Sequence, residues 1–186
     1  MIQIDMPEKC RYMSDYDRLL KGILPIDRKF ILNKTITGCG GTSMFINSSL
    51  PVVIISPRIQ VLKEKHKQHP DTFLFHIPLC NDRAEAIREK MQLSRPPRIL
   101  VTLDSSDKVL SVLKSRGMTD TFLFVVDEFQ CLMGDATFKG STDMNFLVYL
   151  DREARRICYL SATPIPDIFL DNIPQFAGIP YYKLEW

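Results

Sequence analysis

Short, uninterrupted apolar runs constrain the fold of this chain more than any other feature of its sequence. The runs 51–56 and 122–126 are apolar at nearly every position and do not alternate with polar residues. Such runs are typical of strands that are buried on both faces, as in parallel sheets covered by helices. Stretches with helical patterning separate the runs, and strands separated by helices predict right-handed crossovers within one parallel sheet. The pattern therefore predicts an α/β domain with a mostly parallel sheet.

Residues 29–186 are expected to form this domain, and residues 1–28 a lead-in to it. Six to seven strands are expected, at 29–33, 51–56, 72–76, 98–102, 122–126, 156–160 and, as the seventh, 180–184. Helices are expected at 16–24, 43–47, 58–69, 82–91 and 107–115. Ser56, followed by Pro57, resembles the N-cap of the helix at 58–69, and Ser105 or Ser106 is expected to cap the helix at 107–115.

Composition and charge are those of an ordinary globular domain. The 186 residues suffice for one domain, and with a formal net charge of +2 any basic surface must be local. The five cysteines are scattered without a Cys-x-x-Cys pair, which favours a reduced, cytoplasmic protein over a disulfide scaffold or a zinc site. No apolar run approaches the roughly 20 residues of a membrane span, and the N-terminus lacks the layout of a signal peptide. We therefore expect a cytoplasmic address and no membrane partner.

Three polar segments follow three of the expected strands, at the points where those strands end. They lie at 37–43, 126–130 and 160–164. In an open parallel sheet, ligands bind outside the carboxyl ends of the strands. We therefore expect a glycine-rich turn, an acidic pair and a Ser/Thr pair to meet at one edge of the sheet, which is a pattern typical of nucleotide sites.

The first segment is a glycine-rich turn with the sequence Thr-Gly-Cys-Gly-Gly-Thr-Ser. It partly matches the phosphate-binding pattern Gly-x-x-x-x-Gly-Lys-[Ser/Thr]. When Thr42 takes the final position of the pattern, Gly40 takes the second glycine and Gly41 takes the place of the lysine. Successive N–H groups of such a turn bind anions without any side chain, whereas the lysine normally brings positive charge to the β- and γ-phosphates. The turn keeps the backbone features of a phosphate site and lacks its cation.

Lys34 is the candidate replacement for that cation, because it lies at the mouth of the same turn. The alternative is a solvated lysine at the end of a strand, with the glycines forming no more than a tight turn. If the turn binds a nucleotide, the contacting residues are Lys34, Thr37, Gly38, Cys39, Gly40, Gly41, Thr42 and Ser43.

The second and third segments supply carboxylates and hydroxyls. Asp127 follows the run 122–126 and is positioned to hold Mg²⁺ opposite Thr42, within about one water of it. Glu128 is placed to orient or deprotonate an attacking water. The hydroxyls of Ser161 and Thr163 are candidates for bridging neighbouring carboxylates. Taken singly, the acidic pair also suits a surface turn, and the Ser/Thr pair also suits a Ser/Thr turn or a helix cap.

Taken together and in this order, the segments resemble the first RecA-like domain of superfamily 2 helicases. Motif I corresponds to Thr37–Thr42 without its lysine, motif II (the Asp-Glu-x-x box) to Asp127–Gln130, and motif III to Ser161–Thr163. Two weaker matches lie between them, with Ile55–Arg58 similar to motif Ia and Val101–Asp104 at the next strand end. The resemblance covers roughly residues 29–170.

The resemblance implies a three-layer RecA-like P-loop NTPase fold that binds ATP and Mg²⁺. It assigns catalytic roles to Asp127 and Glu128, metal contacts to Thr42 and Asp127, and coupling of hydrolysis to nucleic-acid binding to Ser161 and Thr163. It further implies contact with a DNA or RNA backbone through Arg58, Lys63 and Thr102, and a second RecA-like domain as a partner.

Gly41 departs from the family pattern, so hydrolysis by the isolated domain is expected to be weak or absent. Two other interpretations remain open. In the first, the domain is a RecA-like nucleotide sensor or scaffold that does not hydrolyse ATP. In the second, it is another P-loop ATPase whose lysine comes early in the loop, although Ser161–Pro164 argues against that class.

Overall fold

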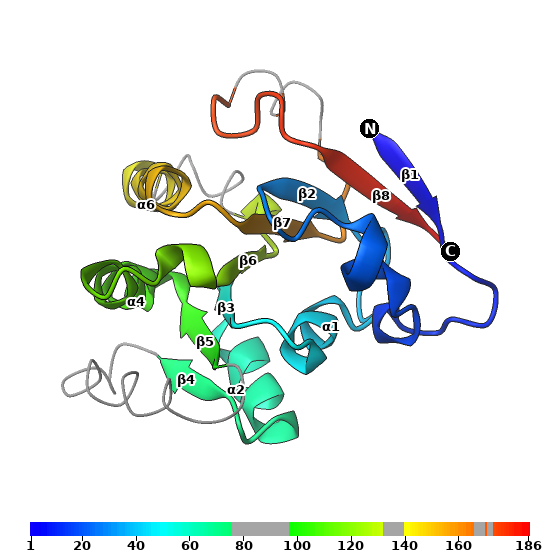
Figure 1. Ribbon diagram of the computed structural model, residues 1–186, viewed down its shortest axis with the longest axis horizontal. Helices are drawn as coiled ribbons and strands as arrows, with labels where there is room; N and C mark the ends of the chain where they lie inside the picture. Colours follow the sequence, from blue (N-terminus) through cyan, green and yellow to red (C-terminus); the bar gives the residue numbers. More distant parts are fainter. Residues whose placement is uncertain (76–96, 132–139, 166–169, 171–172) are drawn as a thin grey trace.

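The computed structural model describes residues 1–75, 97–131, 140–165, 170 and 173–186, with no side chains described for 140–144. It contains one sheet of eight strands in the order β1-β8-β2-β7-β6-β3-β5-β4, and every neighbouring pair is parallel (Figure 1). The strands are β1 (Ile2–Asp5), β2 (Phe30–Asn33), β3 (Val52–Ser56), β4 (Phe73–Phe75), β5 (Arg98–Thr102), β6 (Leu123–Asp127), β7 (Ile157–Ser161) and β8 (Tyr181–Glu185). The predicted α/β class and parallel sheet are confirmed.

Helices cover both faces of the sheet and make three layers. They are α1 (Gly41–Asn47), α2 (Ile59–Gln68), α4 (Leu103–Ser115) and α6 (Gly140–Glu153), together with the 3-10 turns η1 (Met13–Asp15) and η4 (Thr119–Thr121) and the π-helical turn η2 (Leu19–Ile23). In Figure 1, α4 and α6 lie on one side of the sheet, and α1 and the N-terminal turns lie on the other.

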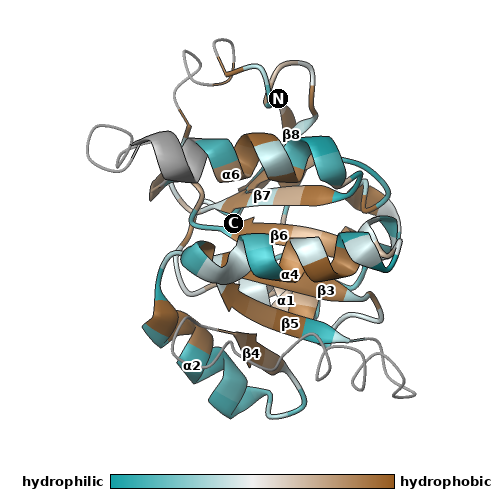
Figure 2. Cartoon of the chain, turned by 90° about the vertical axis from the view of Figure 1, so that its left-hand side faces the viewer, coloured by the Kyte–Doolittle hydropathy of each residue, from teal (hydrophilic) through white to brown (hydrophobic). Residues whose placement is uncertain are grey.

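The strands divide their side chains between two apolar cores, one on each face. On β3, Val53 and Ile55 join the core beneath α4 and α6, whereas Val52 and Ile54 join the core beneath α1, α2 and the N-terminal turns. All five residues of β3 are buried. Figure 2 shows the apolar strands behind α4 and α6, whose outward sides are more polar. The uninterrupted apolar runs therefore mark strands buried on both faces, as predicted.

Two elements of the structure were not expected from the sequence. Strand β1 pairs in parallel with β8 at the edge of the sheet, so the lead-in at 1–28 contributes a strand. Helix α6 was missed because the run 146–150 is apolar at every position and hides its helical period. Within that run Phe146, Leu147 and Leu150 are buried, while Val148 is 47% exposed.

Several helix boundaries also differ from the predicted ones. Helix α2 begins at Ile59 with Arg58 as its N-cap, because Ser56 is still the last residue of β3. Helix α4 begins at Leu103 after Thr102, so the predicted caps Ser105 and Ser106 lie buried inside its first turns. The helix predicted at 16–24 is only the single turn η2. The helix predicted at 82–91 lies outside the described residues.

Candidate functional site

Three strands that carry the polar segments are neighbours in the sheet. β7 lies between β2 and β6, with Asn33 opposite Ser161 and Asp127 opposite Leu160. Because all three strands run in the same direction, their carboxyl ends open onto the same edge (Figure 1). The predicted convergence of the glycine turn, the acidic pair and the Ser/Thr pair is present in the structure.

The glycine turn and the acidic pair are joined by a direct hydrogen bond. The Thr42 hydroxyl donates to Asp127 Oδ2 at 3.0 Å, and the two residues are 7% and 3% exposed. Burial raises the pKa of the Asp127 carboxyl, although the nearby Lys34 ammonium opposes that shift. Among the described residues, Asp127 Oδ1 accepts no hydrogen bond. The turn therefore faces the acidic pair at close range, with one buried carboxylate oxygen that accepts no hydrogen bond from the described residues.

Lys34 reaches into the same place from the end of β2. Its Nζ lies 3.3 Å from Glu128 Oε1 and 3.5 Å from Asp127 Oδ1, and its side chain is 7% exposed. Burial alone would lower the pKa of the Lys34 ammonium, but the two carboxylates outweigh it and the pKa is raised. The interpretation of Lys34 as a solvated strand-end residue is therefore wrong.

Glu128 is held in an unusual backbone conformation. Its φ of 56° lies in the left-handed region, which costs a non-glycine residue on the order of 1 kcal/mol or more. Its Oε1 lies near Lys34, and its Oε2 accepts a hydrogen bond of 2.5 Å from Gln130 Nε2. Both carboxylate oxygens of Glu128 are thus engaged by other side chains.

The backbone of the glycine turn is shaped by its glycines and covered by the N-terminal segment. Gly38 and Gly40 have φ values of 74° and 80°, which side chains rarely adopt. A Cβ on Gly40 would lie 3.4 Å from the Tyr12 Cβ. The Met13 N–H donates to the Cys39 carbonyl at 2.9 Å. This packing of the lead-in against the turn had no signal in the sequence.

The remaining predicted nucleotide contacts differ in exposure. Thr37 and Gly38 are exposed at the mouth of the turn, whereas Cys39 is buried in the core. Cys39 packs as a small apolar residue, and its burial raises the pKa of the thiol. The Ser43 hydroxyl accepts a hydrogen bond of 2.8 Å from Lys65 Nζ on α2, a contact that the sequence did not indicate.

Ser161 and Thr163 form a Ser/Thr turn that uses the Ser161 hydroxyl. The Thr163 N–H donates to Ser161 Oγ at 3.0 Å, and the Ser161 hydroxyl donates to the Thr163 carbonyl at 2.8 Å. The predicted bridging role is therefore wrong for the Ser161 hydroxyl, because both of its partners lie within the turn, whereas Thr163 is exposed. The Ser161 carbonyl instead accepts the Lys34 N–H at 2.8 Å, which ties this turn to the end of β2.

The residues predicted to contact nucleic acid follow two neighbouring strands. Arg58 and Lys63 are exposed on α2 and at its start. Thr102, at the end of β5, is only 8% exposed, and its hydroxyl lies 3.4 Å from Ser105 Oγ. Because Ser56 and Thr102 are register partners, Arg58 and Thr102 share the edge that carries the glycine turn. Arg58 and Lys63 are accessible there, and the Thr102 hydroxyl is largely covered.

The donor atoms at this edge fit Mg²⁺. Among the described residues no group of three or more His, Cys, Asp or Glu could hold a metal ion. Mg²⁺, however, is usually bound through one or two carboxylates and keeps several waters. Asp127 Oδ1, which accepts no hydrogen bond within the described part of the chain and lies 3.5 Å from Lys34 Nζ, and the Thr42 hydroxyl are oxygen donors of the kind it prefers.

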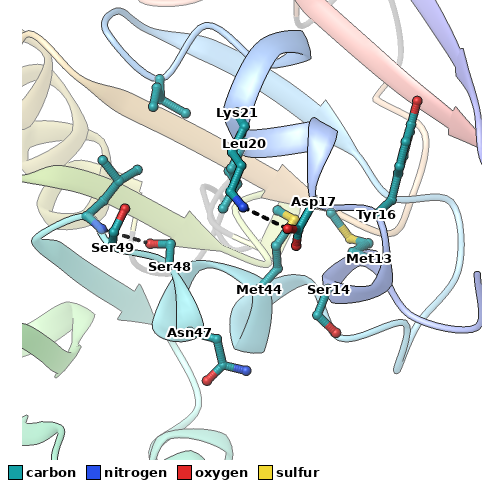
Figure 3. Close-up of a pocket in the computed structure, with 12 residues that line it drawn as sticks. Met13, Ser14, Tyr16, Asp17, Leu20, Lys21, Met44, Asn47, Ser48 and Ser49 are labelled. Atoms are coloured by element: carbon teal, nitrogen blue, oxygen red, sulfur yellow. Dashed lines mark hydrogen bonds and ion pairs between the residues drawn. The ribbon is translucent and has the colours of Figure 1, made fainter.

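A cavity of about 560 Å³ lies elsewhere, between α1 and the N-terminal turns (Figure 3). Its walls include Met13, Leu20 and Met44, and the Lys21–Asp17 ion pair of 2.7 Å lies beside it. Its lining residues do not include the glycine turn or the acidic pair. Within the described part of the chain, no helix is both long and apolar enough to span a bilayer.

The fold is that of a three-layer RecA-like domain, and comparison with the solved structure of a DEAD box protein agrees. A DEAD box protein from the hyperthermophile Methanococcus jannaschii is similar at a TM-score of 0.50 and 16% identity, over 86% of this chain and 46% of that chain. The yeast DEAD-box splicing factor Prp28 matches at a TM-score of 0.48 and 20% identity, over 86% of this chain and 42% of that chain. The chain thus spans less than half the length of either protein. No family model and no curated protein sequence matches it.

Proposed function

We propose that this domain binds ATP with Mg²⁺ at the edge formed by β2, β7 and β6, as the nucleotide-binding domain of a helicase-like nucleic-acid translocase. The hydrogen bond between Thr42 and Asp127 carries the proposal, because it joins a phosphate-loop-like turn to an acidic pair at the ligand-binding edge of a parallel sheet. The RecA-like fold supports the same function by analogy.

Each part of the edge has a role in this proposal. The backbone N–H groups of Gly38–Thr42 cradle the phosphates, with the buried Cys39 side chain and the flanking Thr37 and Ser43 shaping the turn. Thr42 and Asp127 hold Mg²⁺, which, when bound, neutralises charge on the phosphate oxygens. Glu128 positions and deprotonates the attacking water once its carboxylate is released.

One observation favours a second candidate function, ATP binding without hydrolysis. Glu128 has both carboxylate oxygens engaged, by Lys34 and by Gln130. A general base must lie within hydrogen-bond reach of the water that it activates. The domain on its own then binds ATP and releases phosphate slowly or not at all, and a second RecA-like domain is needed for turnover.

Nucleic acid is the proposed macromolecular partner. The exposed Arg58 and Lys63 offer positive charge at the edge that carries the glycine turn, and such residues neutralise backbone phosphates. Thr102 contributes at most a backbone contact, because its hydroxyl is covered. The turn at Ser161 and Thr163 is the proposed coupling element, and the bond from Lys34 N to the Ser161 carbonyl ties it to the nucleotide site.

Calorimetric titration with ATP–Mg²⁺ tests the nucleotide site. We expect Asp127→Asn to lower the affinity at least tenfold, because the substitution removes the negative charge that faces the metal. The matched control is Asp120→Asn, an exposed acid of η4 remote from the site, which should bind ATP as the wild type does. The proposal fails if the wild type shows no binding, or if both variants bind equally well.

Fluorescence anisotropy with single-stranded RNA and DNA tests the second partner, and a phosphate-release assay with and without each strand separates the two candidate functions. The double variant Arg58→Ala/Lys63→Ala should bind nucleic acid more weakly and with a shallower salt dependence. Lys108→Ala, an exposed lysine of α4, is the control. If the double variant and the control bind alike, α2 is not the contact surface.

A further inference from the structure

We propose that Lys34 is the phosphate-binding lysine of this site, delivered from the end of β2, and that Gly41 lacks a side chain because Lys34 occupies the space beside it. This inference rests on the proposed ATP site and identifies which residue supplies the cation that the turn itself lacks. It assigns the role to a position seven residues before the one where the phosphate-loop pattern carries its lysine.

The first argument concerns space at Gly41. A Cβ there would lie 3.3 Å from Lys34 Cδ, and equally close to Leu160 Cδ2 and Met13 Sδ. Favourable contacts between carbon atoms lie at about 3.5–4.0 Å, so a side chain at position 41 would press on the Lys34 stem. Gly41 is the first residue of α1 and, unlike Gly38 and Gly40, does not have a positive φ. Its backbone therefore does not require glycine, and a side chain there would be accommodated only if Lys34, Leu160 and Met13 each shifted by a few tenths of an ångström.

The second argument concerns charge. Burying an ammonium is unfavourable unless it is paired, and Lys34 is paired with two carboxylates at 3.3 and 3.5 Å. An ammonium has three N–H donors. Among the described residues it makes one side-chain hydrogen bond, to Glu128 Oε1, and Asp127 Oδ1 is left without one. The ammonium thus keeps N–H donors that phosphate oxygens of a ligand would accept.

The third argument concerns position. The Lys34 N–H donates to the Ser161 carbonyl at 2.8 Å, and the Lys34 carbonyl accepts the Trp186 indole N–H at 2.9 Å. The next residue, Thr35, has a left-handed φ of 57° and its N–H donates to Asn33 Oδ1 at 2.9 Å. The backbone of Lys34 is therefore fixed by the sheet and its neighbours. A lysine on such a rigid base is pre-organised, and as a compact point charge it does not depend on a particular approach angle.

The test compares the affinities for ATP, ADP and AMP, in the presence of Mg²⁺, of the wild type and Lys34→Met. Methionine keeps most of the stem and removes the charge. We expect the ATP affinity to fall about ten- to a hundredfold, the usual scale for a hydrogen bond to a charged group. The AMP affinity should change much less, because AMP lacks the phosphates that the ammonium would contact. If the ion pair is purely structural, its loss in Lys34→Met should lower the affinities for all three nucleotides by the same factor, or for none of them. Either result overturns the inference.

The exchange of lysine between the two positions tests the shared space. In Lys34→Ala/Gly41→Lys the Lys34 stem no longer crowds position 41, and only the flexible ends of Leu160 and Met13 must shift. We expect the ATP affinity of this variant to return to within a few fold of the wild type. Gly41→Ala keeps Lys34 and serves as the second variant should Lys34→Met not fold. The added methyl group should displace the Lys34 side chain and lower the affinity for ATP more than the affinity for AMP. The inference is contradicted if the exchanged variant does not regain ATP affinity. It is also contradicted if the ratio of ATP affinity to AMP affinity in Gly41→Ala equals that of the wild type.

The result for the wild type separates this inference from the proposed function. If the wild type does not bind ATP, the proposed function fails and the inference falls with it. If the wild type binds ATP and Lys34→Met binds it equally well, the nucleotide site stands and Lys34 serves only to pair the acids. Lys108→Met, on the exposed side of α4, is the control for loss of a positive charge and should match the wild type for all three nucleotides.

Discussion

Thr42 and Asp127 are 85 positions apart in the sequence and share a hydrogen bond of 3.0 Å. The bond exists because β2 and β6 are separated in the sheet only by β7, so the turn after β2 opens beside the end of β6. Both residues are almost fully buried, and a buried polar pair is costly to break from one side. The contact is therefore both the core of the proposed nucleotide site and a structural bond in its own right.

Thr42→Val tests that structural contribution. Valine has the same shape as threonine but no hydroxyl, so it leaves Asp127 Oδ2 buried without its donor. We expect the free energy of unfolding to fall by about 1–3 kcal/mol, the cost of an unsatisfied buried group. Urea denaturation measures the change. Thr42→Ser keeps the hydroxyl, so its free energy of unfolding should fall clearly less than that of Thr42→Val. Equal decreases in the two variants would contradict a stabilising role for the hydrogen bond.

Lys34→Met should lower stability as well as ATP affinity. Removing one partner of a buried ion pair leaves an uncompensated charge, and such changes typically cost about 3–5 kcal/mol. A solvated strand-end lysine would cost almost nothing to replace, whereas the Lys34 side chain is only 7% exposed. Chemical denaturation measures the loss against Lys108→Met. A variant as stable as this control would show that the acids are neutral without Lys34.

The four described cysteines should differ in reactivity. Cys39 and Cys158 are buried, and burial raises the pKa of both thiols, so that little of the reactive thiolate forms near pH 8. Cys10 and Cys131 are only partly buried. In a Cys80→Ser background, iodoacetamide followed by mass spectrometry should modify Cys10 and Cys131 first. Early modification of Cys158 in the native protein would contradict the packing of β7.

Gly40→Ala should be much more harmful than Gly22→Ala. Gly40 has a φ of 80°, and its added methyl would lie 3.4 Å from Tyr12, whereas Gly22 has no atoms within 4 Å of an added Cβ. Alanine in the left-handed region costs about 1–2 kcal/mol. At Gly22 the same change should be neutral, or slightly stabilising because it restricts the unfolded chain. Thermal denaturation compares the two variants, and similar melting temperatures would argue against the turn as described.

Much of the fold could be predicted because its signals are local. A strand buried on both faces needs apolar residues at every position, so β3 and β6 are visible as uninterrupted runs. The direction of parallel strands then places the segments after β2, β6 and β7 at one edge without further information. Helix caps were less certain, because Ser56 and Ser105 suit a cap and a buried interior position equally well by residue type.

The site itself depends on packing between segments that are distant in the sequence. The sequence determined that a glycine turn and an acidic pair face each other, and that the turn lacks its lysine. Only the tertiary structure decided that Lys34 lies between Asp127 and Glu128, and that its stem fills the space a side chain at Gly41 would need. The residue pattern of a strand shows which of its side chains are buried. It does not show which side chain fills a space lined by several segments, and the space around Lys34 is lined by β6, β7 and the N-terminal turns together.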